Sequence, residues 1–498
     1  ALKPLVYPKD WDRLAADIRA VRNQEKAQHN LEYRLITKDD EIIWVSGKSR
    51  TFFNENGEPF MLIGCICEIG KHNKYDNITS LYCEDVLKER YALAKIAEPQ
   101  PVTGTILLIG IDNFREINEK YGTKMGNILL AGVAEAIAVC CKNRENVFRF
   151  HGDEFAVILK EQPSCTTADA KKLYKTIRRK IDSSIEKNGY HMFFTISGGA
   201  ASFNTQEDSY EDVLKNAKFA LHVSKLNGKN TFTPYSEDEY LSYIRRIDIQ
   251  EELRKCVEND FKGFEVYYQP IMKPQTNTLY GSEALIRWHS EKYGFMSPVD
   301  FVPLLEESAL IIPLGKWIIE NAVRQCKAWV SVYPDFIMNI NLSFVQIIKS
   351  DILKDAVELL EQYELSAEHV VFEVTESGEL ENNTAVKHVL NSFNNKSLNL
   401  AIDDFGTGYS NLRYIRDMMF GIIKIDRLFI KDINESSQNY TLVKYVTEMA
   451  HNFNIKVCVE GVETQEEYDK VMTLKPDCIQ GFFYGKPMNA GNFAASYI

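Results

Sequence analysis

The sequence lacks any apolar run that approaches the about 20 residues needed to cross a bilayer, and no signal peptide opens it. Its ten cysteines include no C-x-x-C pair, which disfavours a disulfide framework or a zinc site. Basic residues are not in excess, and the net charge of -12 argues against a general nucleic-acid or anionic-membrane surface. We therefore expect a cytoplasmic protein with reduced cysteines, no nucleic-acid partner and no membrane segment.

An initiator methionine is also missing, because the chain begins Ala1-Leu2-Lys3-Pro4, so we expect a piece of a longer protein. What is present is ordinary for globular domains: 45% hydrophobic and 26% charged residues over 498 positions. This length predicts about three domains, each large enough to bury its own core.

The first 70 residues predict a helix over 9–26 and strands over 31–37, 41–50 and 59–69, with a hairpin turn at Asn56-Gly57. One helix followed by three antiparallel strands resembles the C-terminal half of a PAS sensor domain. The residues that carry this resemblance are Pro8, Asp10, Glu32-Tyr33-Arg34 and Trp44. The resemblance implies a partial PAS domain of α+β fold over 1–70. Residues 71–90 are expected to form a helical connector.

Residues 76–235 predict a second, α/β domain. Its expected strands are 105–111, 147–150, 154–159 and 191–202, and its expected helices are 112–121, 125–141, 167–187 and 210–225. The hairpin His151-Gly152-Asp153-Glu154-Phe155, with Ser197-Gly198-Gly199 later, resembles the GGDEF diguanylate cyclase domain. The resemblance implies a nucleotide-cyclase-like fold.

This second domain departs from the cyclase pattern at the positions that carry chemistry. Gly110 replaces a metal-binding Asp, His151 replaces the first motif glycine, and Asn127 replaces a guanine-reading Asp. Phosphoryl transfer loses most of its charge stabilisation without a metal ligand. We therefore expect a degenerate, catalytically silent domain with a regulatory role, in which Asp153 and Glu154 could still hold GTP weakly.

Residues 236–247 are polar and predict a linker, and 248–498 alternate strand and helix. The expected strands are 264–271, 279–287, 336–342, 370–374, 399–402, 421–425, 456–459 and 478–482. Eight strands separated by helices over about 250 residues predict a TIM-type (β/α)8 barrel. The whole chain is thus expected to be an α/β multidomain protein.

Asp403-Asp404 follow an apolar strand and precede Gly406. A surface turn is the simpler interpretation, because Asp-Asp before Gly is common in turns. A divalent metal site is the alternative, because two carboxylates at a strand end are costly to bury without a cation. Other polar residues lie late in or just after the remaining strands: Glu283, Asn341, Glu373, Lys424, Glu460 and Gln480. In a TIM barrel all of these meet at one end, which favours hard oxygen ligation of magnesium or manganese.

Residues 282–288, Ser-Glu-Ala-Leu-Ile-Arg-Trp, resemble the signature of the EAL cyclic di-GMP phosphodiesterases. Further matches follow in order at Gln269-Pro270-Ile271, Asn341-Leu342-Ser343, Glu373-Val374-Thr375-Glu376-Ser377, the 403–412 loop, Lys424-Ile425-Asp426, Glu460-Gly461-Val462-Glu463 and Gln480-Gly481-Phe482. The resemblance covers the whole of 248–498. It implies a two-metal site in which Glu283, Asn341, Glu373 and Asp403 hold one ion, and Asp403, Asp404 and Glu460 hold the second.

The resemblance also implies the remaining roles. Lys424 orients or polarises the attacking water, and the product is linear pGpG. Gln269, Leu285, Arg287, Glu463 and Gln480 are expected to face the substrate, and Glu376 to brace the 403–412 loop. A homodimer is expected from the family.

Three hypotheses stand at this point. The first is a metal-dependent cyclic di-GMP phosphodiesterase regulated by a silent GGDEF domain and a PAS segment. The second is a receptor that binds cyclic di-GMP without hydrolysis, although the metal ligands that such receptors usually lose are all present. The third is a bifunctional enzyme, which Gly110 and His151 disfavour.

Overall fold

The structure is a computed structural model of the whole chain. It describes residues 3–23, 26, 28–38, 42–53, 59–68, 74–97, 101–141, 143–160, 165–188, 194–376, 384–406 and 420–498. The contacts divide the chain into two compact units, Ala1–Ser242 and Tyr243–Ile498, and each is described by itself. The Asn56-Gly57 turn and residues 407–412 of the 403–412 loop lie outside the described residues.

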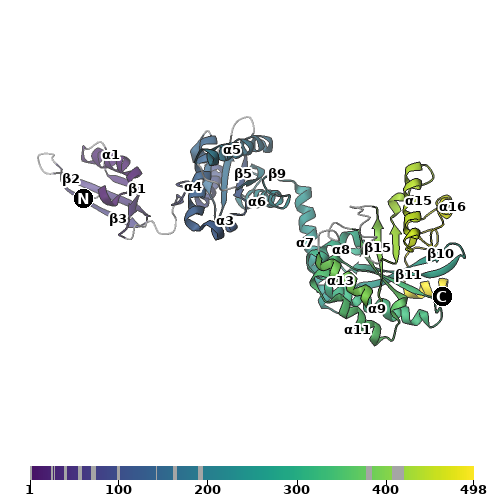
Figure 1. Cartoon of the computed structure of the whole chain (residues 1–498). Helices are drawn as coiled ribbons and strands as arrows, with labels where there is room; N and C mark the ends of the chain where they lie inside the picture. The colour runs from purple at the N-terminus through teal and green to yellow at the C-terminus, as the bar shows by residue number, and fades with distance from the viewer. Residues whose placement is uncertain are drawn as a thin grey trace. The chain divides into compact units, whose positions relative to one another are not determined.

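The N-terminal segment contains the helix and three strands that its sequence predicts. Helix α1 (Trp11–Arg22) lies against an antiparallel sheet of β1 (His29–Ile36), β2 (Ile42–Phe53) and β3 (Pro59–Glu68) (Figure 1). Val6, Leu14, Tyr33 and Val45 form its small core.

The second domain is a mixed sheet of order β4-β6-β7-β5-β8-β9 with helices on both faces. Its strands are β4 (Tyr82–Cys83), β5 (Thr103–Ile111), β6 (Val147–Arg149), β7 (Glu154–Leu159), β8 (Ile196–Asn204) and β9 (Phe232–Pro234). Its helices are α2 (Glu84–Ala97), α3 (Phe114–Tyr121), α4 (Thr123–Cys140), α5 (Thr167–Asn188) and α6 (Tyr210–Leu226). Leu107 and Ile109 face one core and Ile106 and Leu108 the other, as alternation along a fully buried strand requires.

Two expected connecting segments have more structure than their sequences indicate. In the 71–90 connector, Tyr82–Cys83 pairs with β6 and Leu87 of α2 is buried in the domain core, so this part belongs to the second domain. The 236–247 linker is helical, because α7 (Glu237–Glu258) begins at Glu237. Polar composition predicted irregular structure there, but it is equally compatible with an exposed helix.

Helix α4 is the one described helix that is long and apolar enough to cross a membrane, with a mean hydropathy of 1.3. Leu129, Val133 and Ile137, however, lie on its buried side, in the core of the second domain. Its apolar composition is therefore accounted for by packing within this domain.

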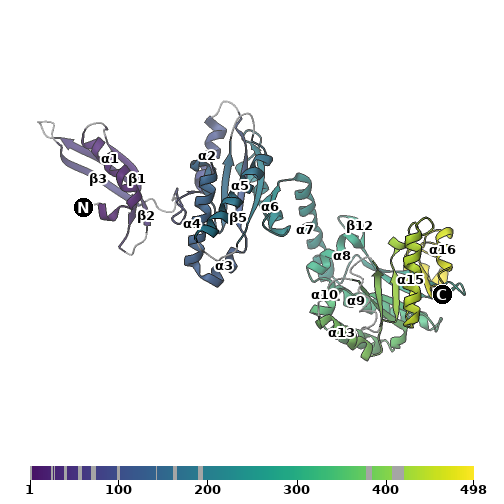
Figure 2. The same cartoon turned by 45° about the horizontal axis from the view of Figure 1, so that its top comes forward.

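The C-terminal unit is a closed eight-stranded barrel, which confirms the expected fold class (Figures 1 and 2). Its strands, in ring order, are β10 (Phe264–Lys273), β18 (Cys478–Gln480), β17 (Lys456–Val459), β16 (Ile422–Ile425), β15 (Asn399–Phe405), β14 (Val370–Thr375), β13 (Ile337–Asn341) and β11 (Thr278–Ser290), which pairs back to β10. A short strand, β12 (Gly294–Met296), adds to β11 outside the ring.

Helices surround the barrel. They are α8 (Pro298–Glu307), α9 (Ile311–Val330), α10 (Phe344–Lys349), α11 (Ile352–Gln362), α13 (Thr384–Asn395), α15 (Ser437–Asn452), α16 (Gln465–Met472) and α17 (Ala490–Tyr497). The barrel departs from an all-parallel TIM barrel at β10, which runs antiparallel to both neighbours. Only residues 274–277 join β10 to β11, and a connection this short permits only an antiparallel hairpin.

Candidate functional site

The barrel interior has two layers of side chains. The polar layer lies at the mouth, where the parallel strands end, and the apolar layer lies beneath it and forms the floor. The lower layer consists of Ile271, Tyr280, Val371, Ala401, Ile422, Cys458 and Cys478. Two positions further toward the mouth on the same strands lie the buried polar side chains Gln269, Glu373, Asp403, Lys424 and Gln480, together with Glu460. Because alternate strand residues share a face, the apolar layer that closes the floor also aims the polar groups into the mouth.

Lys424 lies at the centre of the polar layer and is fully buried. Its Nζ is 2.6 Å from Glu460 Oε1, 2.8 Å from Glu373 Oε2, 3.2 Å from Asp403 Oδ1 and 3.3 Å from Glu283 Oε2. Four carboxylates therefore share one ammonium group. One positive charge cannot balance four negative charges in a buried site. Further cations would therefore stabilise the ionised carboxylates.

Three amide side chains hold Glu283 and its surroundings in place. Asn341 Nδ2 donates to Glu283 Oε1 at 2.6 Å, and Gln480 Nε2 donates to Glu283 Oε2 at 2.6 Å and to Gln269 Oε1 at 3.1 Å. Gln269 in turn donates to the Gly485 carbonyl at 3.1 Å. These bonds fix the Glu283 carboxylate at the point where β10, β11 and β18 meet.

Asn339 is a site residue that sequence reasoning missed. Its side chain is buried, and its Nδ2 donates to Glu373 Oε1 at 2.6 Å. Asn339 and Asn341 are two positions apart on β13 and therefore face the same side. Alternate residues of a strand face the same side, so the spacing of two residues from Asn341 would have identified Asn339 as a site residue.

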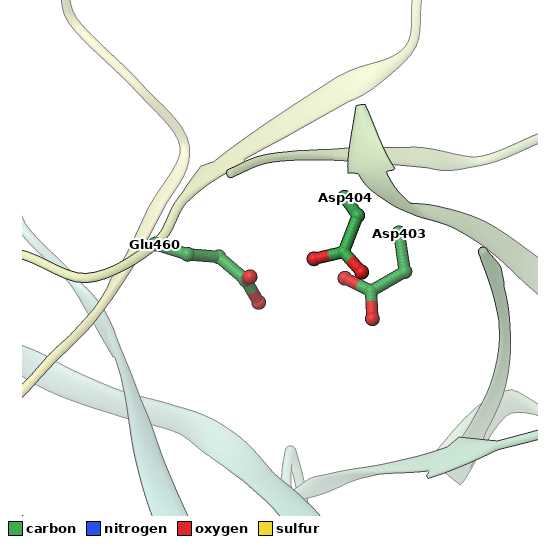
Figure 3. A group of neighbouring side chains, drawn as sticks. All are labelled: Asp403, Asp404 and Glu460. Carbon is green, nitrogen blue, oxygen red and sulfur yellow. The ribbon is translucent and has the colours of Figure 1, made fainter. Parts of the chain in front are cut away.

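Asp403 and Asp404 present their carboxylates on the same side, although adjacent strand residues normally face opposite ways. The pairing of β15 with β16 shifts register between Ile402 and Phe405, and Asp404 has a left-handed backbone with φ of 54°. Figure 3 shows the two carboxylates side by side, with Glu460, just after the end of β17, pointing toward them. One carboxylate oxygen of each of these three residues lies within 4.8 Å of the other two.

Glu376 contacts the beginning of the loop that it was expected to brace. Its backbone N–H donates to the Asp403 carbonyl at 3.0 Å, and its Oε2 accepts from the Gly406 N–H at 2.7 Å. These two bonds connect the end of β14 to both sides of Asp404. The bracing role itself stays a prediction, because residues 407–412 lie outside the described part of the chain.

The carboxylate pKa values reflect burial and mutual repulsion. Burial raises the pKa of Glu373 well above its usual range, and it also raises the pKa of Asp403. Burial, with the Asp403 charge next, raises the pKa of Asp404 to about 7, and burial raises the pKa of Glu460 to about 8. Asp404 and Glu460 therefore bind protons near neutral pH unless another cation replaces the protons.

The pKa values of Lys424 and Glu283 are shifted in the direction opposite to the one that burial alone would give. Burial disfavours the charged ammonium, but the surrounding carboxylates, led by Asp403, raise the pKa of Lys424 well above its usual value. Burial likewise disfavours charged Glu283, but the Lys424 charge and the Gln480 and Asn341 amides lower the pKa of Glu283. Lys424 is thus a protonated donor and not a base.

The residues present fit divalent cations. The donor set is carboxylate and amide oxygen, which suits magnesium or manganese and not soft metals. Asp403 Oδ1 and Gln480 Oε1 are buried without a hydrogen-bond partner among the described residues, and Asp403 Oδ1 has only Lys424 as a nearby cation. Unpaired oxygens beside an excess of negative charge are what a cation would satisfy.

The remaining predicted substrate residues lie at different distances from this centre. Leu285 and Arg287 continue β11 beyond Glu283 on the same face. Glu463 instead forms an ion pair with Arg427 at 3.0 Å, and no contact of its side chain with the carboxylates is found within the described residues. A substrate role for these three residues stays a prediction.

The corresponding site of the GGDEF domain has little left to hold a metal. A Cβ built on Gly110 would lie 2.9 Å from Lys225 Nζ, and Lys225 is also 3.4 Å from Asp153 Oδ2. Asp112, the acid that remains on β5, accepts from Thr195 and Ser197 hydroxyls at 2.7 Å and from the Asn230 N–H at 3.0 Å.

The other residues of this domain site lie near the surface. His151 and Asn127 are exposed, Gly152 has a φ of 68°, and Glu154 is half-buried with its pKa raised by burial. With Asp112 saturated by donors and Asp153 paired with Lys225, little carboxylate charge is left at this site for a GTP-bound metal.

A closed barrel whose strand ends converge on clustered carboxylates defines a class of barrel proteins with an acidic, cation-binding centre. More particularly, the chain is a tandem of three known domains. Family models match a PAS fold at residues 1–66, a diguanylate cyclase GGDEF domain at 73–231 and an EAL domain at 250–487.

Two curated relatives align with most of this chain. MucR of Pseudomonas aeruginosa, named a bifunctional diguanylate cyclase/cyclic di-GMP phosphodiesterase, is 28% identical over 85% of this chain and 61% of MucR. The cyclic di-GMP phosphodiesterase PdeR of Escherichia coli is 29% identical over 79% of this chain and 58% of PdeR. A solved complex of the PaMucR phosphodiesterase with c-di-GMP is 30% identical, with a TM-score of 0.47 over 49% of this chain and 99% of that one. The chain thus spans about three fifths of the length of these curated relatives.

Proposed function

We propose that residues 248–498 hydrolyse cyclic di-GMP to linear pGpG with two divalent ions, Mg²⁺ or Mn²⁺. The observation that carries the proposal is the cluster of carboxylates around Lys424 at the mouth of the barrel. The names of MucR and PdeR, which contain this activity, support it. We further propose that the GGDEF domain and the PAS segment regulate this cytoplasmic enzyme, and that it acts as a homodimer.

The proposed ligands are Glu283, Asn341, Glu373 and Asp403 for one ion and Asp403, Asp404 and Glu460 for the other. Bound ions would lower the pKa of a water and neutralise charge that develops on the phosphoryl oxygens. Lys424 keeps its proton because carboxylates surround it, so it donates hydrogen bonds in the site and keeps the carboxylates at fixed positions. Gln269 and Arg287 are placed on the hairpin face beside Glu283, where they can bind the substrate.

The direct test is chromatography of nucleotides after incubation of the chain with cyclic di-GMP and Mg²⁺ or Mn²⁺. Parallel samples would contain EDTA or the Glu283→Ala variant. We expect linear pGpG from the parent chain with metal and none from either control. Tight binding without product would instead establish a receptor that does not hydrolyse cyclic di-GMP.

Metal affinity is expected to rise with pH. Asp404 and Glu460, with pKa values of about 7 and about 8 in the metal-free protein, must each release a proton before they bind a cation. Both are mostly protonated at pH 6.5 and mostly ionised at pH 8.5, so Mn²⁺ should bind roughly 10- to 100-fold more tightly at the higher pH.

Calorimetric titration with Mn²⁺ at both values, in two buffers of different ionisation enthalpy, measures the affinity and the protons released. Affinity that is independent of pH, with no proton release, would place the ions away from these two carboxylates. The Glu460→Gln variant should lose its share of the proton release.

The GGDEF domain is expected to form no cyclic di-GMP from GTP, because Gly110 removes a ligand and Asp112 is saturated by donors. The assay should use the chain with Glu283→Ala, so that any product is not consumed. Product formation from GTP and Mg²⁺ would show that the domain is active. GTP titrated during cyclic di-GMP hydrolysis separately tests whether a silent domain regulates through GTP.

A further inference from the structure

Beyond the proposed metal ligands, the hairpin of β10 and β11 continues the surface that faces the site. Its register places Gln269 opposite Glu283, Tyr267 opposite Leu285 and Glu265 opposite Arg287. The one register shift lies between Ile271 and Met272, so this part of the hairpin alternates regularly. Tyr267 therefore lies on the same face as Gln269, one rung further from the barrel floor.

The opposite face of the same hairpin is occupied by packing. Tyr268, Ala284 and Trp288 are buried in the cores under the surrounding helices, where Tyr268 makes an edge contact with Trp329 at 4.8 Å. The face that carries Tyr267 cannot be the core face. The Tyr267 side chain is accordingly half-buried, and its register places it beyond Gln269 on the mouth side of the hairpin.

Arg287 fixes Tyr267 from the neighbouring strand. The guanidinium carbon lies 5.6 Å from the centre of the Tyr267 ring, and Arg287 also donates to the Ile286 carbonyl at 2.8 Å. No hydrogen bond joins the Tyr267 hydroxyl to any residue in the described ranges. The ring is therefore positioned through its π-face, and its hydroxyl is dispensable for that position.

We propose that Tyr267, held by Arg287, is a stacking platform for one purine base of the cyclic dinucleotide. The inference rests on the proposed function and adds a residue that binds the base. Phosphate chemistry at the carboxylates requires no aromatic side chain, whereas a flat guanine beside the hairpin gains contact from a fixed ring and a guanidinium. Leu285, on the next strand at the same rung, continues this surface.

The test compares the parent chain with Tyr267→Ala and Tyr267→Phe on cyclic di-GMP and on bis(p-nitrophenyl) phosphate, a phosphodiester without a purine. Tyr267→Ala should raise KM for cyclic di-GMP about 10-fold with a smaller change in kcat, because base stacking contributes about 1–3 kcal/mol per base. The ratio of kcat/KM for the two substrates should fall by the same factor. Tyr267→Phe should restore the parent values.

The matched control is Phe453→Ala. Phe453 is another aromatic residue with solvent exposure, 53% exposed, but it lies between α15 and the start of β17, at the opposite end of the barrel from the mouth. It should leave both substrates unaffected. Equal losses on both substrates in Tyr267→Ala, or no loss on either, would overturn the proposal.

Direct binding separates this proposal from the proposed function. If the parent hydrolyses cyclic di-GMP and Tyr267→Ala matches it, the stacking role fails and the phosphodiesterase stands. If the parent binds cyclic di-GMP without hydrolysis and Tyr267→Ala weakens the Kd about 10-fold, the stacking role stands and the phosphodiesterase fails.

Discussion

Replacement of Asp403 by Asn is expected to lower kcat/KM for cyclic di-GMP about 10³-fold, the scale reported when one electrostatic stabiliser is removed from a preorganised site. Asp403 is the residue proposed to hold both ions, and its carboxylate is buried 3.2 Å from Lys424. An amide offers one neutral oxygen where the carboxylate offers two charged ones. The measurement is steady-state hydrolysis at saturating Mn²⁺.

Asp403→Asn should be at least as stable as the parent chain in the absence of metal. Burial raises the pKa of Asp403, which means that its charge is unfavourable in the metal-free protein, so a neutral side chain should leave the thermal midpoint in EDTA unchanged or higher. The rise of the midpoint on addition of Mn²⁺ should be lost. Glu466→Gln, at an exposed position at the start of α16, is the control for loss of one carboxylate. A variant that keeps a tenth of the parent rate would show that Asp403 is not a shared ligand.

Replacement of Lys424 by Met is expected to destabilise the metal-free protein by about 3–5 kcal/mol, because it leaves four carboxylates without their buried counter-charge. Methionine has nearly the same length and leaves no large cavity. Hydrolysis should fall about 10²- to 10³-fold, since the cation that is proposed to hold the carboxylates in place is lost. Urea unfolding in EDTA gives the free energy of unfolding.

The same unfolding experiment in Mn²⁺ sharpens this prediction. Divalent ions replace part of the missing positive charge, so Mn²⁺ should stabilise Lys424→Met more than it stabilises the parent. Lys444→Met, which removes an exposed lysine 3.9 Å from Glu448, should change the free energy of unfolding by less than about 0.5 kcal/mol. Equal destabilisation with and without metal would mean that Lys424 acts through packing alone.

The strands of the barrel could be predicted because each one is a short apolar run that ends in a polar residue. All eight predicted runs overlap the strands of the ring. The direction of β10 could not be read from apolar periodicity, which is the same for parallel and antiparallel strands; it follows from the short connection to β11. The helix in 236–247 was missed because composition alone does not separate an exposed helix from a linker.

Most of the candidate site was also predictable, through the rule that barrel strands present their functional groups at one end. Asn339 was missed although its spacing from Asn341 could have identified it. The pairing of Glu463 with Arg427 could not have been found, because it depends on how two loops approach each other.

By itself, the sequence determined the strand periodicity and the chemical groups at each strand end, since both are local properties of the chain. Only the tertiary structure decided that Lys424 meets Glu283, 141 residues away, because barrel closure brings together strands that are distant in sequence. It also decided that Asp403 and Asp404 point the same way. That outcome needs a register shift and a left-handed Asp404, and this backbone conformation is held by the neighbouring strands and by Glu376, not by any local preference.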